Sequence, residues 1–171
     1  MTMLVTGATG KIGCRLVKRL AERDDQVRAL IRDPMRATQL EADSIELAEG
    51  DLLDTDSLAA AVSGTDAVVH CAAFFRGATS EEAHNVNDVG TRRLAIAARA
   101  AGVKRFIFLS TGLVYGSNGG RSASEDDHCS PTAAYPASKL AAERFLLGLE
   151  DLDVRVLRLA FVYGDGDPHI A

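Results

Sequence analysis

Tyr135 and Lys139 are the residues whose types and spacing point most directly to chemistry. On a helix, side chains four residues apart lie one turn apart on the same face, so the Lys139 ammonium can sit near the Tyr135 phenol. A free tyrosine titrates near ~10, and a nearby positive charge favours the phenolate, which would lower the pKa of the phenol and suit it to proton transfer. The structural alternative is a helix start at which Tyr135 packs and Lys139 is solvated.

Three glycines, Gly7, Gly10 and Gly13, form a GxxGxxG pattern directly after the apolar run at residues 3–6. Without β-carbons, the backbone can turn sharply from a strand into a helix and approach a pyrophosphate lying on the helix N-terminus. A tight turn without a ligand is the alternative. Because strand, turn and helix come in the required order, the pattern favours nucleotide binding.

The elements that must position these residues alternate between short apolar runs and longer segments of helical period. Helices are expected over about 11–23, where Ile12, Leu16 and Leu20 share one face, and over 80–101. Strands are expected at 3–6, 26–31, 44–47, 67–71, 105–110 and 154–159, and several are apolar throughout, as buried parallel strands are. This alternation predicts an α/β fold: a doubly wound parallel sheet, or Rossmann fold, of about six strands with helices on both faces.

Composition and charge narrow the class of protein further. The chain has 171 residues, of which 47% are hydrophobic and 25% are charged, as is typical of a soluble globular domain. Nineteen basic and twenty-four acidic side chains are scattered along it and give a net charge of −5, so nucleic acid is not an expected partner. No apolar run approaches the ~20 residues of a membrane span, so no membrane association is expected.

The cysteines and histidines suggest no metal site. Cys14, Cys71 and Cys129 are odd in number, far apart and without CxxC spacing, which favours neither a disulfide framework nor zinc. His70 has no second ligand at metal spacing, so we interpret it as a packed strand residue and Cys71 as a small core residue. With no secretory signal at the N-terminus, a reducing cytoplasm fits best.

The sequence TGATGKIG differs from the GxGxxG of standard dinucleotide dehydrogenases and resembles the TGxxGxxG of the short-chain dehydrogenase/reductase family. Further motifs of that family follow in order over residues 3–166: Asp51-Leu52, VVHCAA, NDVGT, FIFLSTGLVYG and YPASK. Together they resemble the extended branch of the family, of the NAD-dependent epimerase/dehydratase type. That branch includes nucleotide-sugar epimerases and dehydratases and the related 3-hydroxysteroid and dihydroflavonol-type reductases.

The resemblance implies Thr111, Tyr135 and Lys139 as catalytic residues, with Ser110 as the reserve candidate for Thr111. In the family, the hydroxyl bonds the substrate oxygen, the tyrosine takes or gives the proton, the lysine also holds the nicotinamide ribose, and hydride moves to or from the cofactor ring. The residues that the resemblance implies for cofactor binding are Gly7, Thr9, Gly10, Lys11, Ile12, Gly13, Arg32, Asp51, Leu52, Ala72, Ala73, Asn87, Tyr135 and Lys139.

The residues at the end of the second predicted strand, in the stretch VRALIRDP, indicate which cofactor is bound. An acidic residue there would bond a ribose 2'-hydroxyl and repel a 2'-phosphate, whereas an arginine attracts the phosphate. Ile31 stands where NAD-type members of the family carry Asp, and Arg32 follows it as the only basic group expected at that strand end. NADP is therefore the favoured cofactor and NAD the alternative. In the structural interpretation, Arg32 is a solvated loop cation that Asp33 neutralises.

The family continues well beyond the position of Ala171 with a substrate-binding domain. The resemblance therefore implies a dinucleotide-binding domain over residues 1–171, with the C-terminal substrate domain absent. Three functions stay open: an NAD(P)-dependent oxidoreductase or epimerase acting on a nucleotide sugar or similar hydroxyl or ketone substrate, a dihydroflavonol- or 3-hydroxysteroid-type ketone reductase, and a truncated, non-catalytic NAD(P)-binding module. The expected partner is a small-molecule substrate, and a homodimer is left open.

Overall fold

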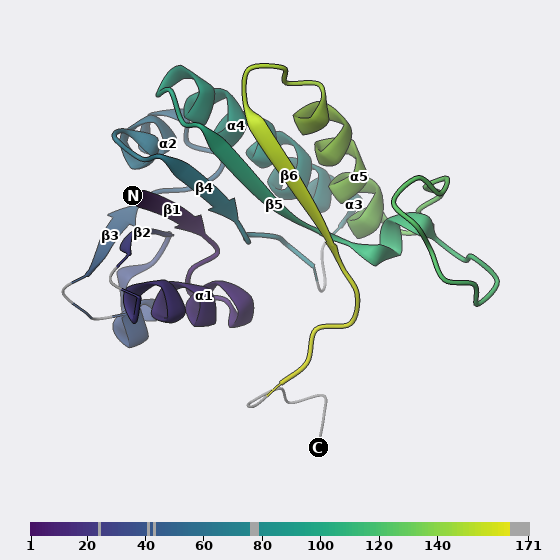
Figure 1. The fold of residues 1–171 in the computed structure, drawn as a ribbon, viewed down its shortest axis with the longest axis horizontal. Coiled ribbons are helices and arrows are strands. Elements are labelled where there is room, and N and C mark those ends of the chain that lie inside the picture. The colour runs from purple at the N-terminus through teal and green to yellow at the C-terminus, as the bar shows by residue number, and fades with distance from the viewer. Residues whose placement is uncertain (24, 41, 43, 76–78, 165–171) are drawn as a thin grey trace.

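A six-stranded parallel sheet forms the centre of the molecule (Figure 1). The structure is a computed structural model that describes residues 1–164 apart from 24, 41, 43 and 76–78, so residues 165–171 of the predicted domain lie outside it. The strands are β1 (Thr2–Thr6), β2 (Gln26–Ile31), β3 (Ile45–Glu49), β4 (Ala67–His70), β5 (Arg105–Thr111) and β6 (Asp153–Leu159). Their order, β3-β2-β1-β4-β5-β6, is that of a Rossmann fold and confirms the predicted fold class.

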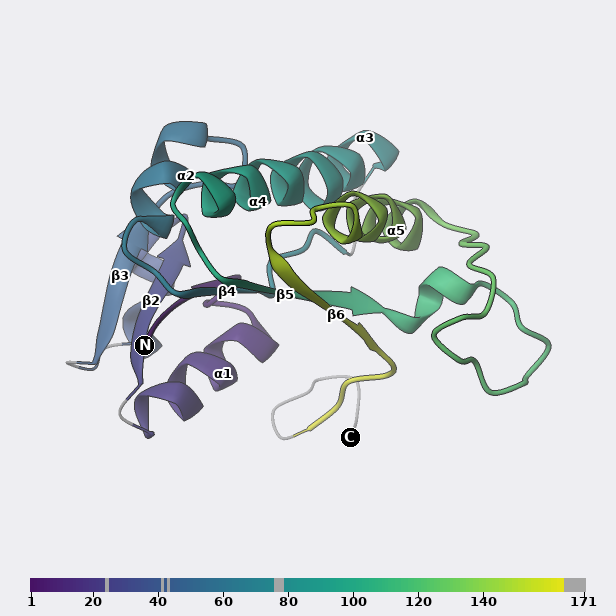
Figure 2. The same cartoon turned by 45° about the horizontal axis from the view of Figure 1, so that its top comes forward.

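Helices cover both faces of the sheet (Figure 2). One face carries α1 (Lys11–Ala21), and the other carries α2 (Thr55–Val62), α3 (Ser80–Ala83), α4 (Gly90–Ala100) and α5 (Ala134–Leu147). Short segments complete the chain: η1 (Pro34–Arg36), η2 (Thr38–Leu40), the π-helical η3 (His84–Val89) and η4 (Gly112–Tyr115). No helix in the described part of the chain is long and apolar enough to cross a membrane.

The two hydrophobic cores follow the alternation of side chains along the strands. Leu4 and Val68 belong to the core beneath α2, α4 and α5, whereas their neighbours Val5 and Val69 belong to the core beneath α1. Because both faces of the central strands are covered, these strands are apolar throughout, and this explains why the sequence predicted them well.

Two predicted segments differ in detail from the structure. Strand β3 begins one residue later and ends two residues later than expected, and its ladder with β2 runs from Val27 opposite Ile45 to Ile31 opposite Glu49. Helix α1 ends two residues earlier than expected, and its fully buried residues are Gly13, Cys14 and Val17. Of the three residues expected to share one face of this helix, Leu16 and Leu20 are partly buried against the core, whereas Ile12 is 36% exposed.

The segment predicted as one helix over 80–101 consists of α3, η3 and α4 in continuous succession. Its middle part has π-helical geometry, which turns Asn87 and Asp88 inward instead of presenting only apolar side chains to the core. A π-turn holds one more residue than an α-turn, so a pattern based on a 3.6-residue period cannot foresee which polar residues it buries. Helix α2 was not predicted, although Asp54 caps its N-terminus by accepting a hydrogen bond from the Asp56 amide.

Candidate active site

The glycine turn between β1 and α1 has no room for side chains. Gly7 has φ of +66°, and a β-carbon there would lie 2.7 Å from the Ala72 nitrogen. A β-carbon on Gly13 would lie 2.1 Å from the Gly7 carbonyl oxygen, so both glycines are needed for helix and strand to pack this closely. Gly10 is the N-cap residue of α1, and no side chain caps this helix end. Gly10 itself has no side chain that could accept a hydrogen bond from the first amides of α1.

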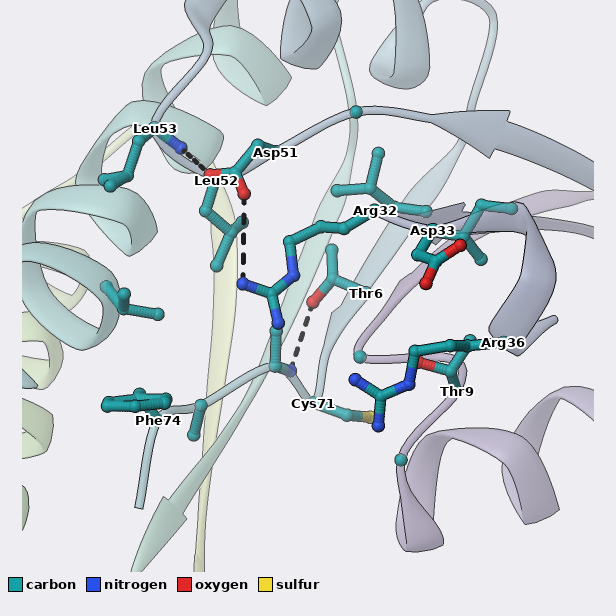
Figure 3. Close-up of a pocket in the computed structure, with 18 residues that line it drawn as sticks. Thr6, Thr9, Arg32, Asp33, Arg36, Asp51, Leu52, Leu53, Cys71 and Phe74 are labelled. Carbon is teal, nitrogen blue, oxygen red and sulfur yellow. Dashed lines mark hydrogen bonds and ion pairs between the residues drawn. The ribbon is translucent and has the colours of Figure 1, made fainter. Parts of the chain in front are cut away.

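A cleft of about 520 Å³ opens at this turn, along the carboxyl ends of the strands (Figure 3). Of the residues predicted to bind a cofactor, the cleft lining includes Gly7, Thr9, Gly10, Arg32, Asp51, Leu52, Ala72 and Ala73. Thr6 supports the far wall, since its hydroxyl accepts a hydrogen bond from the Ala72 amide at 3.3 Å. Lys11, Ile12 and Gly13 lie in the first turn of α1 and are not part of the lining.

Two arginines enter the cleft from the segment that follows β2. Figure 3 shows Arg32 reaching toward Asp51, with Nη1 4.0 Å from Oδ2, and Arg36 extending toward Thr9 and Cys71. The expectation that Arg32 is the only basic group at this strand end was therefore wrong, because the turn η1 brings Arg36 back into the cleft. Asp33 does not pair with Arg32; its carboxylate accepts a hydrogen bond from the Met35 amide at 3.0 Å.

Cys71 packs against the core beneath α1, as expected of a small core residue, but it is only partly buried and also lines the cleft. Burial raises the pKa of its thiol to about 12, so the thiol is neutral near pH 7. Arg36 and Cys71 are two lining residues that the sequence patterns did not mark. Arg36 could have been found only by predicting a turn at Asp33-Pro34 and noting that such a turn brings Arg36 back to the end of β2.

Tyr135 and Lys139 lie one turn apart on α5, as the sequence predicted, but their surroundings differ from expectation. The Tyr135 ring packs edge-to-face on Phe75, with 4.6 Å between centroids. Burial raises the pKa of the Tyr135 phenol above its usual value, so the expected lowering by Lys139 is not met in this structure.

Lys139 is 1% exposed, and its Nζ lies 3.9 Å from the centroid of the Phe108 ring. Desolvation lowers the pKa of its ammonium to about 7, against smaller raising effects of Cys71 and Glu143. The interpretation of Lys139 as a solvated helix residue is therefore wrong. A buried amine with a pKa near neutrality is a group that readily changes its protonation state.

Thr111 ends β5 and is 8% exposed. Its hydroxyl accepts a hydrogen bond from the Leu113 amide at 3.2 Å and so begins the turn η4, against which α5 packs. The reserve candidate Ser110 points the other way, and its hydroxyl donates a hydrogen bond to Glu143 on α5. The hydroxyl of Ser110 is thus engaged inside the core.

Asn87 is fully buried behind the cleft wall. Its amide oxygen accepts from the Phe74 amide at 2.7 Å, and its Nδ2 donates to the Phe74 carbonyl at 3.0 Å and to the Ser138 hydroxyl at 3.1 Å. Ser138 in turn donates to the Tyr135 carbonyl at 2.8 Å. Asn87 therefore ties the wall that carries Phe74 to the helix that carries Tyr135.

His70 is a buried strand residue, as predicted. Since the Thr91 hydroxyl donates to the Asn87 carbonyl at 2.7 Å, Thr91 must accept from His70 Nε2 at 2.8 Å, and Nδ1 then accepts from the Thr6 hydroxyl at 2.6 Å. Burial also lowers the pKa of His70, so the ring is neutral. The histidine joins β1 to α4 through its hydrogen bonds with Thr6 and Thr91.

Comparison with known proteins places the chain in a family. The model of the "NAD dependent epimerase/dehydratase family" matches residues 3–171. Sterol demethylase protein B of Methylococcus capsulatus is 37% identical over 98% of this chain and 53% of its own length, and UDP-glucose 4-epimerase of Vibrio cholerae is 33% identical over 96% and 53%.

The solved structure of a short-chain dehydrogenase/reductase superfamily protein from Agrobacterium tumefaciens with bound NAD is similar, with a TM-score of 0.80 and 33% identity. The match covers 92% of this chain and 48% of that one, so the chain spans about half the length of the relatives it matches. The chain belongs to the NAD dependent epimerase/dehydratase family, within the extended short-chain dehydrogenases/reductases.

Proposed function

We propose that this chain is the cofactor-binding part of an NADP(H)-dependent oxidoreductase or epimerase. The main support for the proposal is a cleft that is lined by the glycine turn, up to Gly10 at the N-cap of α1, and by two arginines. The residues present fit a dinucleotide. A pyrophosphate needs close approach to the backbone, and Gly7 and Gly10, which line the cleft, have no side chain that would hold a ligand away from it.

Arg32 and Arg36 support a preference for NADP(H) over NAD(H). Two guanidinium groups near the carboxyl end of β2 can form charge-assisted hydrogen bonds to a 2'-phosphate, which NAD(H) lacks. Asp51 is close enough to Arg32 to hold the guanidinium across the cleft. Leu52, Ala72 and Ala73 give the cleft the apolar walls that an adenine or nicotinamide ring requires.

We assign the proposed chemistry to Thr111, Tyr135 and Lys139. The cofactor would supply hydride transfer when bound. Thr111 would hold the substrate oxygen by a hydrogen bond, Tyr135 would give or take the proton at its hydroxyl, and Lys139 would donate hydrogen bonds to the ribose from its Nζ. The high pKa of Tyr135 in this structure suits a proton donor better than a standing phenolate.

The proposed substrate is a nucleotide sugar or a similar hydroxyl or ketone compound, as the family's name and the similarity to UDP-glucose 4-epimerase suggest. An apolar ketone is the second candidate. It is favoured by Phe75, whose ring is 52% exposed and packs on Tyr135 at the place where a substrate must approach the phenol. The similarity to Sterol demethylase protein B agrees with this candidate.

Calorimetric titration of the chain with NADPH and NADH tests the proposal. We expect NADPH to bind more tightly, and Arg32→Ala and Arg36→Ala each to weaken NADPH binding by about tenfold, the equivalent of one charge-assisted hydrogen bond. The double variant should bind both cofactors alike. Arg19→Ala, which removes an exposed arginine of α1, is the matched control for the change in net charge and should leave both affinities unchanged.

Equal affinities of the unmodified chain for NADPH and NADH would contradict the assignment of Arg32 and Arg36. No binding of either cofactor would contradict the proposed function as a whole. Binding followed by NADPH-dependent conversion of a nucleotide sugar or an apolar ketone would separate an enzyme from a non-catalytic binding module.

A further inference from the structure

A buried ion pair joins the helix that carries Tyr135 and Lys139 to the strands beside it. Glu143 of α5 is 1% exposed, and its Oε2 accepts hydrogen bonds from Arg158 of β6, at 3.0 Å from Nε and 2.7 Å from Nη2. Its other oxygen accepts a hydrogen bond from Ser110 of β5. One carboxylate therefore connects α5, β5 and β6.

Arg158 extends this connection to the segment after β5. Its Nη1 donates to the Tyr115 hydroxyl at 2.8 Å and to the Glu125 carbonyl at 3.1 Å, and the guanidinium lies 5.0 Å from the centroid of the Tyr115 ring. Tyr115 ends η4, which follows Thr111 directly, and Glu125 lies in the loop between η4 and α5. The ion pair thus fixes the connection between the proposed catalytic hydroxyl and the proposed catalytic helix.

Glu143 is also placed to act on Lys139, because the two residues are four apart on α5 and share a helix face. Among the groups that interact with Lys139, the thiol of Cys71 is neutral because its pKa is about 12, and His70 is neutral because burial lowers its pKa. Tyr135, with a raised pKa, is neutral as well. Glu143, which raises the pKa of Lys139, is the charged group that favours the ammonium.

A contribution to stability is a weak explanation for the Glu143–Arg158 pair, because apolar side chains can often replace a buried ion pair without loss of stability. We propose that Glu143 is a positioning residue that, held by Arg158 and Ser110, fixes α5 against the end of β5 and places its carboxylate one helical turn from Lys139. Its importance for catalysis rests on the proposed function. An ammonium offers three donors to a ribose, and an uncharged amine offers fewer.

The variant Glu143→Gln keeps the shape of the side chain and removes its charge. In the cofactor-free chain labelled with 13C at the lysine ε-carbons, the Lys139 resonance should then titrate at lower pH than in the unmodified chain, by at least about half a pH unit. Lys139→Met assigns the resonance. Glu143→Asp retains the charge, so its Lys139 midpoint should lie closer to that of the unmodified chain than the midpoint of Glu143→Gln does. A purely steric role of Glu143 would not predict this difference.

Asp153→Asn is the matched control. It removes the charge of a different ion pair, between Asp153 of β6 and Arg105 of β5, whose atoms lie 2.8 Å apart where both strands begin, and it should leave the Lys139 midpoint unchanged. If Glu143→Gln does not fold, Glu143→Gln combined with Arg158→Met decides, since removing both charges of a buried pair is better tolerated than breaking the pair.

An unchanged Lys139 midpoint in a folded Glu143→Gln chain, or in the double variant, would overturn the proposal. The titration needs no cofactor. A chain that fails to bind NADPH would therefore contradict the proposed function, whereas the NMR result would still decide the role of Glu143.

Discussion

At the scale of single residues, Lys139 departs most from what its motif suggested. The YxxxK spacing predicted that the ammonium lies beside the phenol and lowers its pKa, but the ammonium is buried over Phe108 and the pKa of Tyr135 is raised. Spacing along a helix defines which side chains share a face. It does not reveal that Phe75, from a distant segment, covers Tyr135 or that β5 places an aromatic ring under Lys139. Desolvation, and with it the direction of a pKa shift, depends on such contacts.

The burial of Lys139 predicts a stability that depends on pH. Its pKa in the folded chain, about 7, lies below the usual 10.5, so between these values the unfolded chain binds more protons and stability rises with pH. Below about pH 7 the cost of the buried ammonium is fully present. We expect Lys139→Met to raise the free energy of unfolding at pH 6 by roughly 1–3 kcal/mol, with a smaller gain at pH 9.

Urea unfolding at the two pH values measures this effect. Lys104→Met is the control, because Lys104 is exposed and its replacement should change stability little and equally at both pH values. A Lys139→Met chain that is less stable than the unmodified one at pH 6, or equally affected at both, would contradict a destabilising ammonium.

At the scale of elements, the β1–α1 turn shows what a local pattern can predict. The three glycines mark a turn whose backbone closely approaches the segment that follows β4 and also the start of α1, and Gly7 and Gly13 have no room for a β-carbon. The face of α1 and the π-turn at η3 could not be predicted in the same way. Both depend on how closely each helical segment packs against the elements beside it. In η3, Asn87 can be buried because its side-chain amide forms hydrogen bonds with Phe74 and Ser138.

Gly13→Ala tests the turn. Its β-carbon would lie 2.1 Å from the Gly7 carbonyl oxygen, so α1 must move away from β1. We expect a loss of about 1–3 kcal/mol in the free energy of unfolding and at least about tenfold weaker NADPH binding, since the amides at the start of α1 move with the helix.

Gly64→Ala is the control for this substitution, measured by urea unfolding and NADPH titration. Gly64 has φ of +68°, and a β-carbon added there would have nothing within 4 Å, so alanine meets only backbone strain of about 1–2 kcal/mol. The NADPH affinity of Gly64→Ala should match that of the unmodified chain. If Gly13→Ala binds NADPH equally well, the glycine turn does not contact the cofactor.

At the scale of the whole molecule, the fold class and most of the cleft were predictable because each depends on local periodicity or on a short motif. The contacts that join distant segments were not. Glu143 and Ser110 are thirty-three residues apart, and no pattern in the sequence indicates that the carboxylate of one meets the hydroxyl of the other. The same limit applies to Arg36, whose entry into the cleft depends on the turn that follows Asp33.

The edge of the sheet predicts how the 171-residue chain behaves in solution. Strand β6 pairs only with β5 among the described strands, and Leu157 on it is 47% exposed. Unpaired backbone groups beside an apolar side chain favour strand pairing between copies.

We expect sedimentation velocity to show association that grows with protein concentration. Leu157→Lys should shift the chain toward the monomer at little cost in stability, because a charge on an edge strand opposes pairing. Ile96→Lys, at a 54% exposed position on α4, should associate like the unmodified chain. A chain that stays monomeric throughout, or a Leu157→Lys chain that associates as strongly as the Ile96→Lys control, would show that β6 is not the surface through which copies meet.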